Sequence, residues 1–556
     1  MYKLYLVENY SIINQTNKMK KLSLFLVLIL SYFSSFTQEL SNDFKVSVGE
    51  PYQVIDAGSK EYISLDNGYA LMVKMGRGVV NIQKYDINGM KEVARNTYDD
   101  LPKGAIFQNV LKLNDNVYYF YLIYNKKEKN FTLYSREIDT EATSFKQAVE
   151  IIKTSRKVTP VEATGELTDA KVGLAGMVRD IKFDFHKSFD ESKLLITYRL
   201  YPKSKNDAEN YDEIGFFVFD NKISKQWGSE VKLPYTEKQI NNVAYAVGKN
   251  GEAKMLVANR DKKVYEAITV LPSGETKVSD LGISTDQLVK TLKVNETANG
   301  NFIYAGFYAN GIEFTFNPFT GGNFKFNANG LMLFEIDNDG KLVKNKNYEF
   351  TKEFIQQNLN ERLKKQVEER EKDGKAGIFD LYLLDFVVKD DNSCVFIGER
   401  QWLVNEYWGT QKKAVYHFGN AVAIKVDANG ELAWMKKLPK NQAGVMGSGQ
   451  MGISYMEGKE NDYVAFVDNI KNIELDASGG IPVAHKDGHG GYLTTYKINL
   501  ATGNMEKHSI CNLDQIESYK AYQFKPTRIL KVSPNEFLME IYIKDKKDTM
   551  VKFKVN

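Results

Sequence analysis

Cysteine is scarce in this chain, with only Cys394 and Cys511 among 556 residues. A disulfide-built scaffold is therefore excluded, which leaves either one bridge or two separate buried thiols, and the sequence favours two thiols. Charge of one sign is also lacking, because 74 basic and 71 acidic residues leave a net charge of +3. The chain carries neither the electrostatic footprint of a nucleic-acid-binding protein nor an acidic tail.

The sequence motifs of common catalytic sites are also lacking. No G-x-S-x-G, H-E-x-x-H or P-loop pattern is present. The glycines of Gly447–Gly452 fit G-x-G-x-x-G, but no helical pattern follows them, so a dinucleotide site is not indicated. Glu335–Gly340 resembles the start of a calcium loop, but Lys346 stands where that loop needs a glutamate. Acidic residues are too numerous to single out a glycosidase-type pair, so no catalytic residue is assigned.

Long apolar runs are lacking except near the amino terminus. Two lysines precede the apolar run Leu22–Phe33, which at about 12 residues is short for a membrane span. Small residues occupy the −3 and −1 positions before Gln38. We expect residues 1–37 to comprise an upstream extension, 1–18, and a secretory signal peptide cleaved near Gln38. The alternative is an uncleaved membrane anchor. No membrane span is expected in the mature chain.

What the sequence does contain is a repeated hairpin, clearest in Asn420–Lys440. Its valines and isoleucines alternate with other residues at a period of two, which is typical of a half-buried strand. An Asn-Gly turn follows, and this pair tolerates the positive φ of a tight hairpin. Related turns recur near Ile87–Gly89, Asp139, Asp220, Leu271–Gly274, Asp337–Gly340 and Asn499–Gly503.

A second kind of hairpin precedes each of the first kind. It occurs eight times, at Asp66–Gly68, Asn114–Asn116, Asp190–Ser192, Gly248–Gly251, Ala298–Gly300, Asp390–Asn392, Gly458–Glu460 and Ser533–Asn535. Two hairpins in series make a four-stranded antiparallel unit, which is the blade of a β-propeller.

The eighth unit has only three strands before the chain ends. Phe44–Gly49 is a strand-like segment without a partner, and pairing it with Thr549–Val555 would close the ring. The sequence thus predicts an all-β fold: a β-propeller of eight four-stranded blades closed by the two chain ends. The alternatives are seven blades or two packed β-sandwiches.

Residues 38–556 are expected to form a single propeller domain with long insertions. In an up-and-down blade, the connection between the second and third strands lies on the same face as the connection to the next blade. Every long insertion is of one of these two kinds, so we expect them all on one face, where binding usually resides. The insertions lie at about 153–178, 202–213, 308–329, 351–380, 402–419 and 469–491.

One insertion has helical periodicity. Apolar residues recur at helical spacing among charged ones, at Phe354, Ile355, Leu359, Leu363 and Val367. We expect one inserted helix packed on the rim of the propeller. A partner-binding helix is the alternative.

Aromatic residues concentrate in the insertion at 402–419. Trp402, Tyr407, Trp408 and His417 are the candidate ligand-binding residues, because aromatic rings stack on sugars and peptides. Packing of these rings against each other in a β-hairpin is the simpler explanation of the same residues.

A second candidate site is the glycine-rich stretch 484–490. His485, Asp487 and His489 fall within five residues, and imidazole and carboxylate suit a divalent metal. A solvated loop without metal is the alternative, and no other cofactor is expected.

Two resemblances bear on the fold. Val426–Trp434 resembles the strand-turn-Trp unit of quinoprotein-type propellers, but the tryptophan does not recur in most blades, so no quinone cofactor is implied. Ile397–Arg400, Ala423–Asp427 and Lys436–Gln442 together resemble a group of uncharacterised exported proteins of Bacteroidota, over about residues 380–500. That second resemblance implies a propeller fold and export, but no activity.

Three functional hypotheses follow. The leading one is an exported, non-catalytic propeller that binds a protein or a glycan through the loops of one face. The second is a glycan hydrolase or lyase with acidic residues near the central channel, and the third is a structural component of the cell envelope. The periplasm is favoured over release from the cell.

We expect the amino-terminal sequence of the exported protein to begin at Gln38. Leu26→Arg should block export and leave a longer precursor, because a charge interrupts the apolar region that the secretion machinery reads. Leu40→Arg, which lies beyond the cleavage position, should be processed normally. Edman sequencing and mass spectrometry of the envelope fraction make the measurement, and a mature chain that keeps the apolar run would contradict it.

Overall fold

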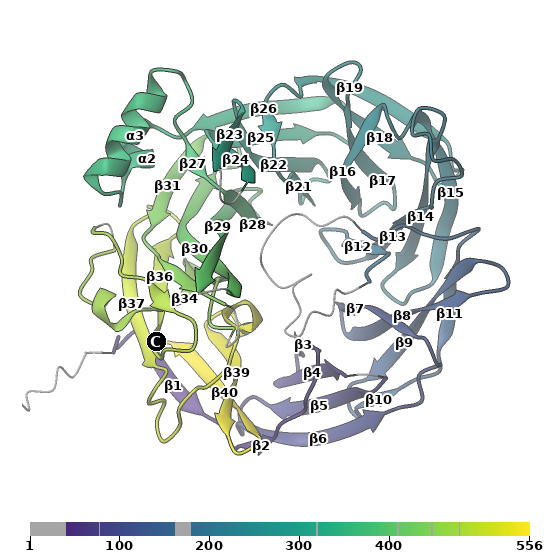
Figure 1. Ribbon diagram of the computed structural model, residues 1–556. Helices are drawn as coiled ribbons and strands as arrows, with labels where there is room; N and C mark the ends of the chain where they lie inside the picture. Colours follow the sequence, from purple (N-terminus) through teal and green to yellow (C-terminus); the bar gives the residue numbers. More distant parts are fainter. Residues whose placement is uncertain are drawn as a thin grey trace, which may run out of the picture. The chain divides into compact units, whose positions relative to one another are not determined.

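A computed structural model describes residues 40–76, 78–161, 180–317, 321–408, 411–445, 449–477 and 479–556. One compact unit covers Asn42–Asn556. Eight sheets, or blades, each built on four antiparallel strands, are arranged in a ring (Figure 1). The predicted eight-bladed β-propeller is confirmed.

The first four blades follow one another along the chain. Blade 1 contains β3 (Ser59–Ser64), β4 (Tyr69–Met75), β5 (Val80–Asp86) and β6 (Lys91–Tyr98). Blade 2 contains β7 (Ile106–Leu113), β8 (Asn116–Asn125), β9 (Asn130–Asp139), β10 (Ser144–Phe145) and β11 (Val149–Lys153). Blade 3 contains β12 (Asp184–Lys187), β13 (Lys193–Arg199), β14 (Tyr211–Asp220) and β15 (Lys225–Thr236). Blade 4 contains β16 (Ile240–Val247), β17 (Ala253–Asn259), β18 (Val264–Val270) and β19 (Thr276–Ser284).

The second half of the ring carries more additions to its blades. Blade 5 contains β20 (Leu288–Val289), β21 (Lys293–Glu296), β22 (Phe302–Ala309), β25 (Gly330–Ile336) and β26 (Leu342–Glu349). Blade 6 contains β28 (Leu381–Val388), β29 (Cys394–Trp408), β30 (Gln411–Val426) and β31 (Leu432–Leu438), and is extended by β32 (Gln442–Gly444) and β35 (His485–Lys486). Blade 7 contains β33 (Ile453–Met456), β34 (Asn461–Asp468), β36 (Tyr492–Asn499) and β37 (Met505–Asn512). Blade 8 contains β38 (Leu530–Ser533), β39 (Glu536–Lys544), β40 (Lys547–Val555), β1 (Phe44–Val48) and β2 (Tyr52–Gln53). Strands such as β7, β12, β16, β21 and β28 lie nearest the centre of the ring (Figure 1).

A small sheet of β23 (Ile312–Asn317), β24 (Gly321–Ala328) and β27 (Ile378–Phe379) is added beside blade 5. Two short 3-10 segments, η1 (Ile470–Asn472) and η2 (Pro526–Arg528), lie in connections. In the described part of the chain, no helix has the length and apolarity needed to cross a membrane.

The middle strands of the blades are buried on both sides. All eight residues of β22 are buried, whereas the outermost strand β6 has no fully buried residue. Each middle strand lies between two neighbouring blades, so both of its faces pack against apolar side chains. This explains why these strands read as near-continuous apolar runs.

The predicted turns lie where the sequence placed them. In the hairpin between β30 and β31, Gly430 adopts a φ of 82°. The Asp427 carboxylate accepts hydrogen bonds from the backbone N–H groups of Asn429 at 3.0 Å and Glu431 at 2.7 Å. A left-handed glycine and a local carboxylate acceptor together fix the turn.

The ring closes by pairing the two ends of the unit, as predicted. In β1 and β40, Phe44 pairs with Val555 and Val48 pairs with Val551, in antiparallel register. The Asn556 backbone N–H also donates to the Asp43 carbonyl at 2.9 Å. β1 thus completes blade 8 as its outermost strand and covers an edge that would otherwise be open.

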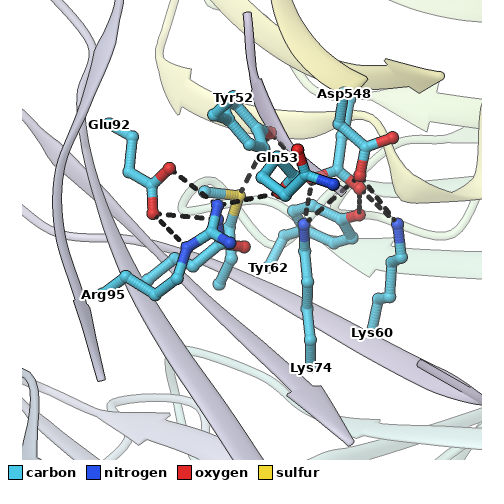
Figure 2. A network of polar contacts seen from close by, with 11 residues as sticks. Tyr52, Gln53, Lys60, Tyr62, Lys74, Glu92, Arg95 and Asp548 are labelled. Carbon is cyan, nitrogen blue, oxygen red and sulfur yellow. Dashed lines mark hydrogen bonds and ion pairs between the residues drawn. The ribbon is translucent and has the colours of Figure 1, made fainter. Parts of the chain in front are cut away.

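A buried ion network joins blade 8 to blade 1 (Figure 2). Glu540 on β39 accepts from Lys74 on β4, whose side chain is fully buried, and from Lys60 on β3 at 2.7 Å. The Lys60 and Lys74 ammonium groups also lie 3.4 Å and 3.7 Å from an Asp548 carboxylate oxygen. Two cations and two anions therefore face each other across the junction where the ring closes.

The environment sets the charge of these groups. Burial alone would raise the pKa of Glu540, but the Lys74 and Lys60 ammonium groups outweigh it and hold that pKa well below its usual range. Burial and the neighbouring Glu540 charge raise the pKa of Asp548 to about 6. The tyrosines at positions 52 and 62 add hydrogen bonds to Glu540 at 2.8 Å and 2.7 Å. Glu540 is thus the centre of the network.

The helical insertion differs from the expectation of one helix. It forms two helices, α2 (Lys352–Gln356) and α3 (Glu361–Glu371), because Asn358 takes a φ of 59° and Asn360 caps a new helix. Leu363, one of the apolar residues at helical spacing, is 39% exposed.

The remaining apolar residues of that insertion pack on the propeller. Phe354, Ile355 and Val367 are buried. The buried Lys437 of blade 6 donates to the carbonyls of Ile355 at 2.9 Å and Gln357 at 2.8 Å, at the carboxyl end of α2. The helices are therefore tied to the outer strand of blade 6.

Both cysteines are free and buried, as the sequence favoured. Burial raises the pKa of the Cys394 and Cys511 thiols to about 12, so both stay protonated near neutral pH.

The long connections share one face of the ring. Those at 310–329 and 469–491 join the second and third strands of blades 5 and 7, and those at 154–183, 350–380 and 439–452 join one blade to the next. In blade 6 the insertion expected at 402–419 is instead formed by the ends of the long strands β29 and β30. Because neighbouring strands are antiparallel, both kinds of connection lie at the same end of the strands. We call this end the long-connection face.

Replacing Glu540 by Gln should lower the free energy of unfolding by about 3–5 kcal/mol, because the buried Lys74 would lose its principal counter-charge. Urea unfolding monitored by tryptophan fluorescence makes the measurement. The control is Glu536→Gln on the same strand, where a half-exposed Lys554 is the partner at 3.5 Å; its effect should stay within about 0.5 kcal/mol. Equal effects of the two substitutions would contradict this account of ring closure.

Candidate functional site

A cavity of about 1460 Å³ lies on one side of the central channel. Its walls come from the innermost strands of blades 3 to 6 and from the connections that lead into them. It is lined at the start of β16, by residues 240–244, and at the end of β17, by residues 258–260. Since inner strands begin and second strands end at the long-connection face, the cavity lies at that face.

One wall is organised around Arg199 at the end of β13. Its guanidinium donates to Asp212 at 2.8 Å and to Glu237 at 2.9 Å. Asn242 of β16 donates to the other Asp212 oxygen at 2.8 Å, and Asn210 donates to Glu237 at 2.7 Å. The charges of this wall are therefore satisfied within the protein, and the wall is rigid.

Beside Arg199 lies an aromatic pair. The His186 and Tyr245 ring centroids are 5.8 Å apart. Burial lowers the pKa of His186 to about 4, so the imidazole is neutral at physiological pH. Burial, together with the Asp212 charge, raises the pKa of Tyr245 far above its usual value, so its hydroxyl stays protonated. Both groups are therefore uncharged donors or acceptors of hydrogen bonds near neutral pH.

Two buried polar atoms in the cavity lining have no hydrogen-bond partner among the residues described. They are His186 Nε2 and Thr291 Oγ1, whereas the Asn242 side chain, whose Oδ1 is also buried, interacts with the Tyr245 hydroxyl. A buried polar atom without a partner costs free energy, so each needs an explanation such as a water or a ligand. Their presence in one cavity favours a polar ligand there.

Another part of the lining contains Lys290, between β20 and β21. Its ammonium nitrogen lies 3.4 Å from the Tyr382 ring centroid and 5.8 Å from that of Phe326. Burial lowers the pKa of Lys290 to about 8, although the charge of Asp380 acts in the other direction. Within the described ranges, no carboxylate lies within 4 Å of this ammonium group, as an ion pair would require.

The cavity also contains a carboxyl group that departs from its usual ionisation. Burial raises the pKa of Asp385 on β28, while the nearby Lys293 ammonium opposes this shift. Lys293 itself donates to the Leu384 carbonyl. Other acidic lining residues are Asp184, Asp207 and Glu237.

The aromatic candidates from the sequence lie elsewhere. Trp402 and His417 face each other across β29 and β30 as register partners, with their rings stacked at 4.9 Å and 6°. Arg400 lies over the Trp402 ring at 4.8 Å. Neither candidate lines the cavity, and the side chains of Tyr407 and Trp408 lie outside the described residues. A ligand-binding role for this set stays a prediction.

The metal candidates have different surroundings. His485 is 2% exposed and lies in β35, whereas Asp487 is half-buried and His489 is exposed. Burial lowers the pKa of His485 to about 4, with further contributions from the Lys440 and His489 charges. A metal role for these three residues stays a prediction.

One other group of potential ligands, Asp43, Glu506 and His508, brings its ligand atoms within 4.8 Å of each other. It is the one such group in the part of the chain that the structure describes. The Lys497 ammonium lies 2.8 Å from Asp43 and 3.5 Å from Glu506, so a protein cation already occupies this position.

Sequence reasoning missed Lys290 and the residues around it. They come from separate blades, and no motif or periodicity marks them. The one signal available was the expectation that the long connections gather on one face.

No protein-family model and no curated protein matches the chain. Among solved structures it is similar to dipeptidyl peptidase 4 of Porphyromonas gingivalis, at 11% identity over 89% of this chain and 67% of that one, with a TM-score of 0.37. It is also similar to the β-propeller domain of the Trilobed protease from Pyrococcus furiosus, at 10% identity over 85% and 98%, TM-score 0.34. The Dos1 propeller matches at 6% identity over 92% and 96%, TM-score 0.38. These are likenesses of fold at low identity, and a relation to exported proteins of Bacteroidota stays a prediction.

His485 should make the protein less stable in acid. Its pKa is lower in the folded chain than in the unfolded chain, so unfolding binds a proton below about pH 6.5, and stability falls as the pH drops toward 4. Between pH 7 and pH 5 the loss should be roughly 2 kcal/mol smaller in His485→Gln than in the wild type. Urea unfolding at both pH values measures this difference. Identical losses in the two proteins would contradict it.

Proposed function

We propose that this protein is an exported, non-catalytic propeller that binds a partner protein at its long-connection face. The cavity at this face is the observation that carries the proposal, because a rigid wall surrounds polar atoms that the described residues leave without partners. A volume of about 1460 Å³ exceeds the roughly 300–1,000 Å³ of small-molecule pockets and suits an extended segment.

Exposed aliphatic side chains on the same face support a protein partner over a glycan. Val445, Ile470, Ile481 and Val483 are each at least 46% exposed, and all lie in long connections of blades 6 and 7. The Asn472 side-chain amide donates to the Val483 carbonyl at 2.7 Å and accepts from the Val483 backbone N–H at 2.7 Å. These two hydrogen bonds give the loop a defined conformation. Branched aliphatic groups pack against apolar protein surface, whereas sugars are recognised by aromatic rings and polar groups.

Export belongs to the proposal, and it is supported by the basic and apolar pattern before Gln38. We place the mature chain in the periplasm.

Val483→Asp should weaken partner binding at least tenfold, because a carboxylate would enter the apolar part of the contact. The matched control is Val93→Asp, an equally exposed valine on the outer strand of blade 1. Photo-crosslinking in the native envelope, followed by titration of each identified partner, makes the measurement. Partners that bind both variants equally would contradict the proposal, and binding to a glycan array alone would favour a sugar ligand.

The specific observation that favours a second candidate, a glycan hydrolase or lyase, is Asp385. A carboxyl group with a raised pKa in a cavity with other acidic and aromatic residues suits a general acid. Hydrolysis of a polysaccharide panel by the wild type but not by Asp385→Asn would establish this alternative. It would contradict the proposal that the protein is non-catalytic.

A further inference from the structure

Lys290 differs from the buried lysines of this protein in how its charge is compensated. Lys74 and Lys440 are paired with Glu540 and Glu399, and Lys437 donates to backbone carbonyls. Lys254 donates to a threonine hydroxyl and a backbone carbonyl. For Lys290, the contacts that the described residues supply are the faces of two aromatic rings.

The position of Lys290 in the cavity lining makes its ammonium group available to a ligand. Lys290 lines the cavity, and so does the next residue, Thr291, whose buried hydroxyl oxygen has no hydrogen-bond partner in the described chain. The rings of Tyr382 and Phe326 fix the ammonium group in place while leaving its N–H donors without an oxygen acceptor among those residues. An ammonium group and a hydroxyl that line the same cavity are two donors suited to a carboxylate.

We propose that Lys290 anchors a carboxylate group of the protein segment that enters the cavity. This inference rests on the proposed function, since it identifies what the cavity recognises. A carboxylate fits better than a phosphate, because phosphate sites usually combine several cations or an arginine fork, and Arg199 is already bound to Asp212 and Glu237. The carboxylate can be the terminus of the partner chain or an acidic side chain.

The charges around Lys290 determine the pH dependence. Asp380 and Tyr382 face it from the segment that enters β28, and Lys293 and Asp385 line the same wall. A bound carboxylate favours the ammonium form, so binding should raise the pKa of Lys290 from about 8. Binding should therefore weaken as the pH rises, by about tenfold between pH 7 and pH 9.

The experiment uses the mature protein with its lysines ¹³C-dimethylated, and Lys290→Arg identifies the Lys290 signal by its loss. The probes are an acetylated pentaglycine with a free terminal carboxylate, the same peptide with a central glutamate and an amidated terminus, and the fully amidated pentaglycine. We expect either or both carboxylate peptides to raise the pKa of the Lys290 signal, and the amidated peptide to leave it unchanged. The first two probes distinguish a chain terminus from an acidic side chain. Equal responses to all three peptides would overturn the inference.

A binding measurement separates this inference from the proposed function. Lys290→Met should weaken the binding of each partner identified by crosslinking at least tenfold at pH 7, and should remove the pH dependence of that binding. The control is Lys277→Met, which replaces an exposed lysine on β19 and should change neither the affinity nor its pH dependence. Unchanged thermal unfolding midpoints show that both variants fold. A partner that binds Lys290→Met as tightly as the wild type would overturn the carboxylate anchor and leave the proposed function standing. If Val483→Asp fails to weaken binding while the carboxylate peptides still shift Lys290, the proposed function fails and the anion site remains.

Discussion

The structure depends on the closure of the ring between the two ends of its compact unit. Pairing the two ends ties the last blade to the start of the unit, because β1 supplies the outermost strand that blade 8 lacks. The ion network around Glu540 lies at the same junction. Burying these charges costs more than a surface pair would, so the network favours one arrangement of blades 8 and 1 over others more than it adds net stability.

Closure determines where a ligand can bind. Because all blades share one strand order, the long connections gather at one end of the ring, and the cavity lies at that end between blades 3 and 6. The network of Arg199, Asp212 and Glu237 holds one wall in place before any ligand arrives. Such preorganisation reduces the entropy cost of binding. The lining around Lys290 differs, since the charge of Lys290 is balanced mainly by aromatic rings.

The candidate site was less predictable than the fold. Trp402 and His417 stood out in the sequence because aromatic residues concentrate there, and the structure stacks them on each other across a hairpin. Lys290 had no such signal, since a lysine between two short strands looks like any solvated lysine. Its surroundings come from Phe326 and Tyr382, about 36 and 92 positions away along the chain. The helical insertion shows a smaller limit, because periodicity did not reveal the left-handed turn at Asn358.

The sequence alone determined the number of blades, the positions of their turns and the pairing of the two ends. The strands and turns are local features, because alternation at a period of two favours strands and turns such as the one ending at Gly430 favour hairpins. The pairing of the two ends was inferred by counting strands, since the eighth unit had three and Phe44–Gly49 had no partner. Only the tertiary structure decided which side chains share the cavity, which polar atoms lack partners among the described residues, and that the ammonium group of Lys290 lies against aromatic rings. The reason is that burial and contact depend on residues brought together by the ring from distant parts of the chain, and no local pattern encodes them.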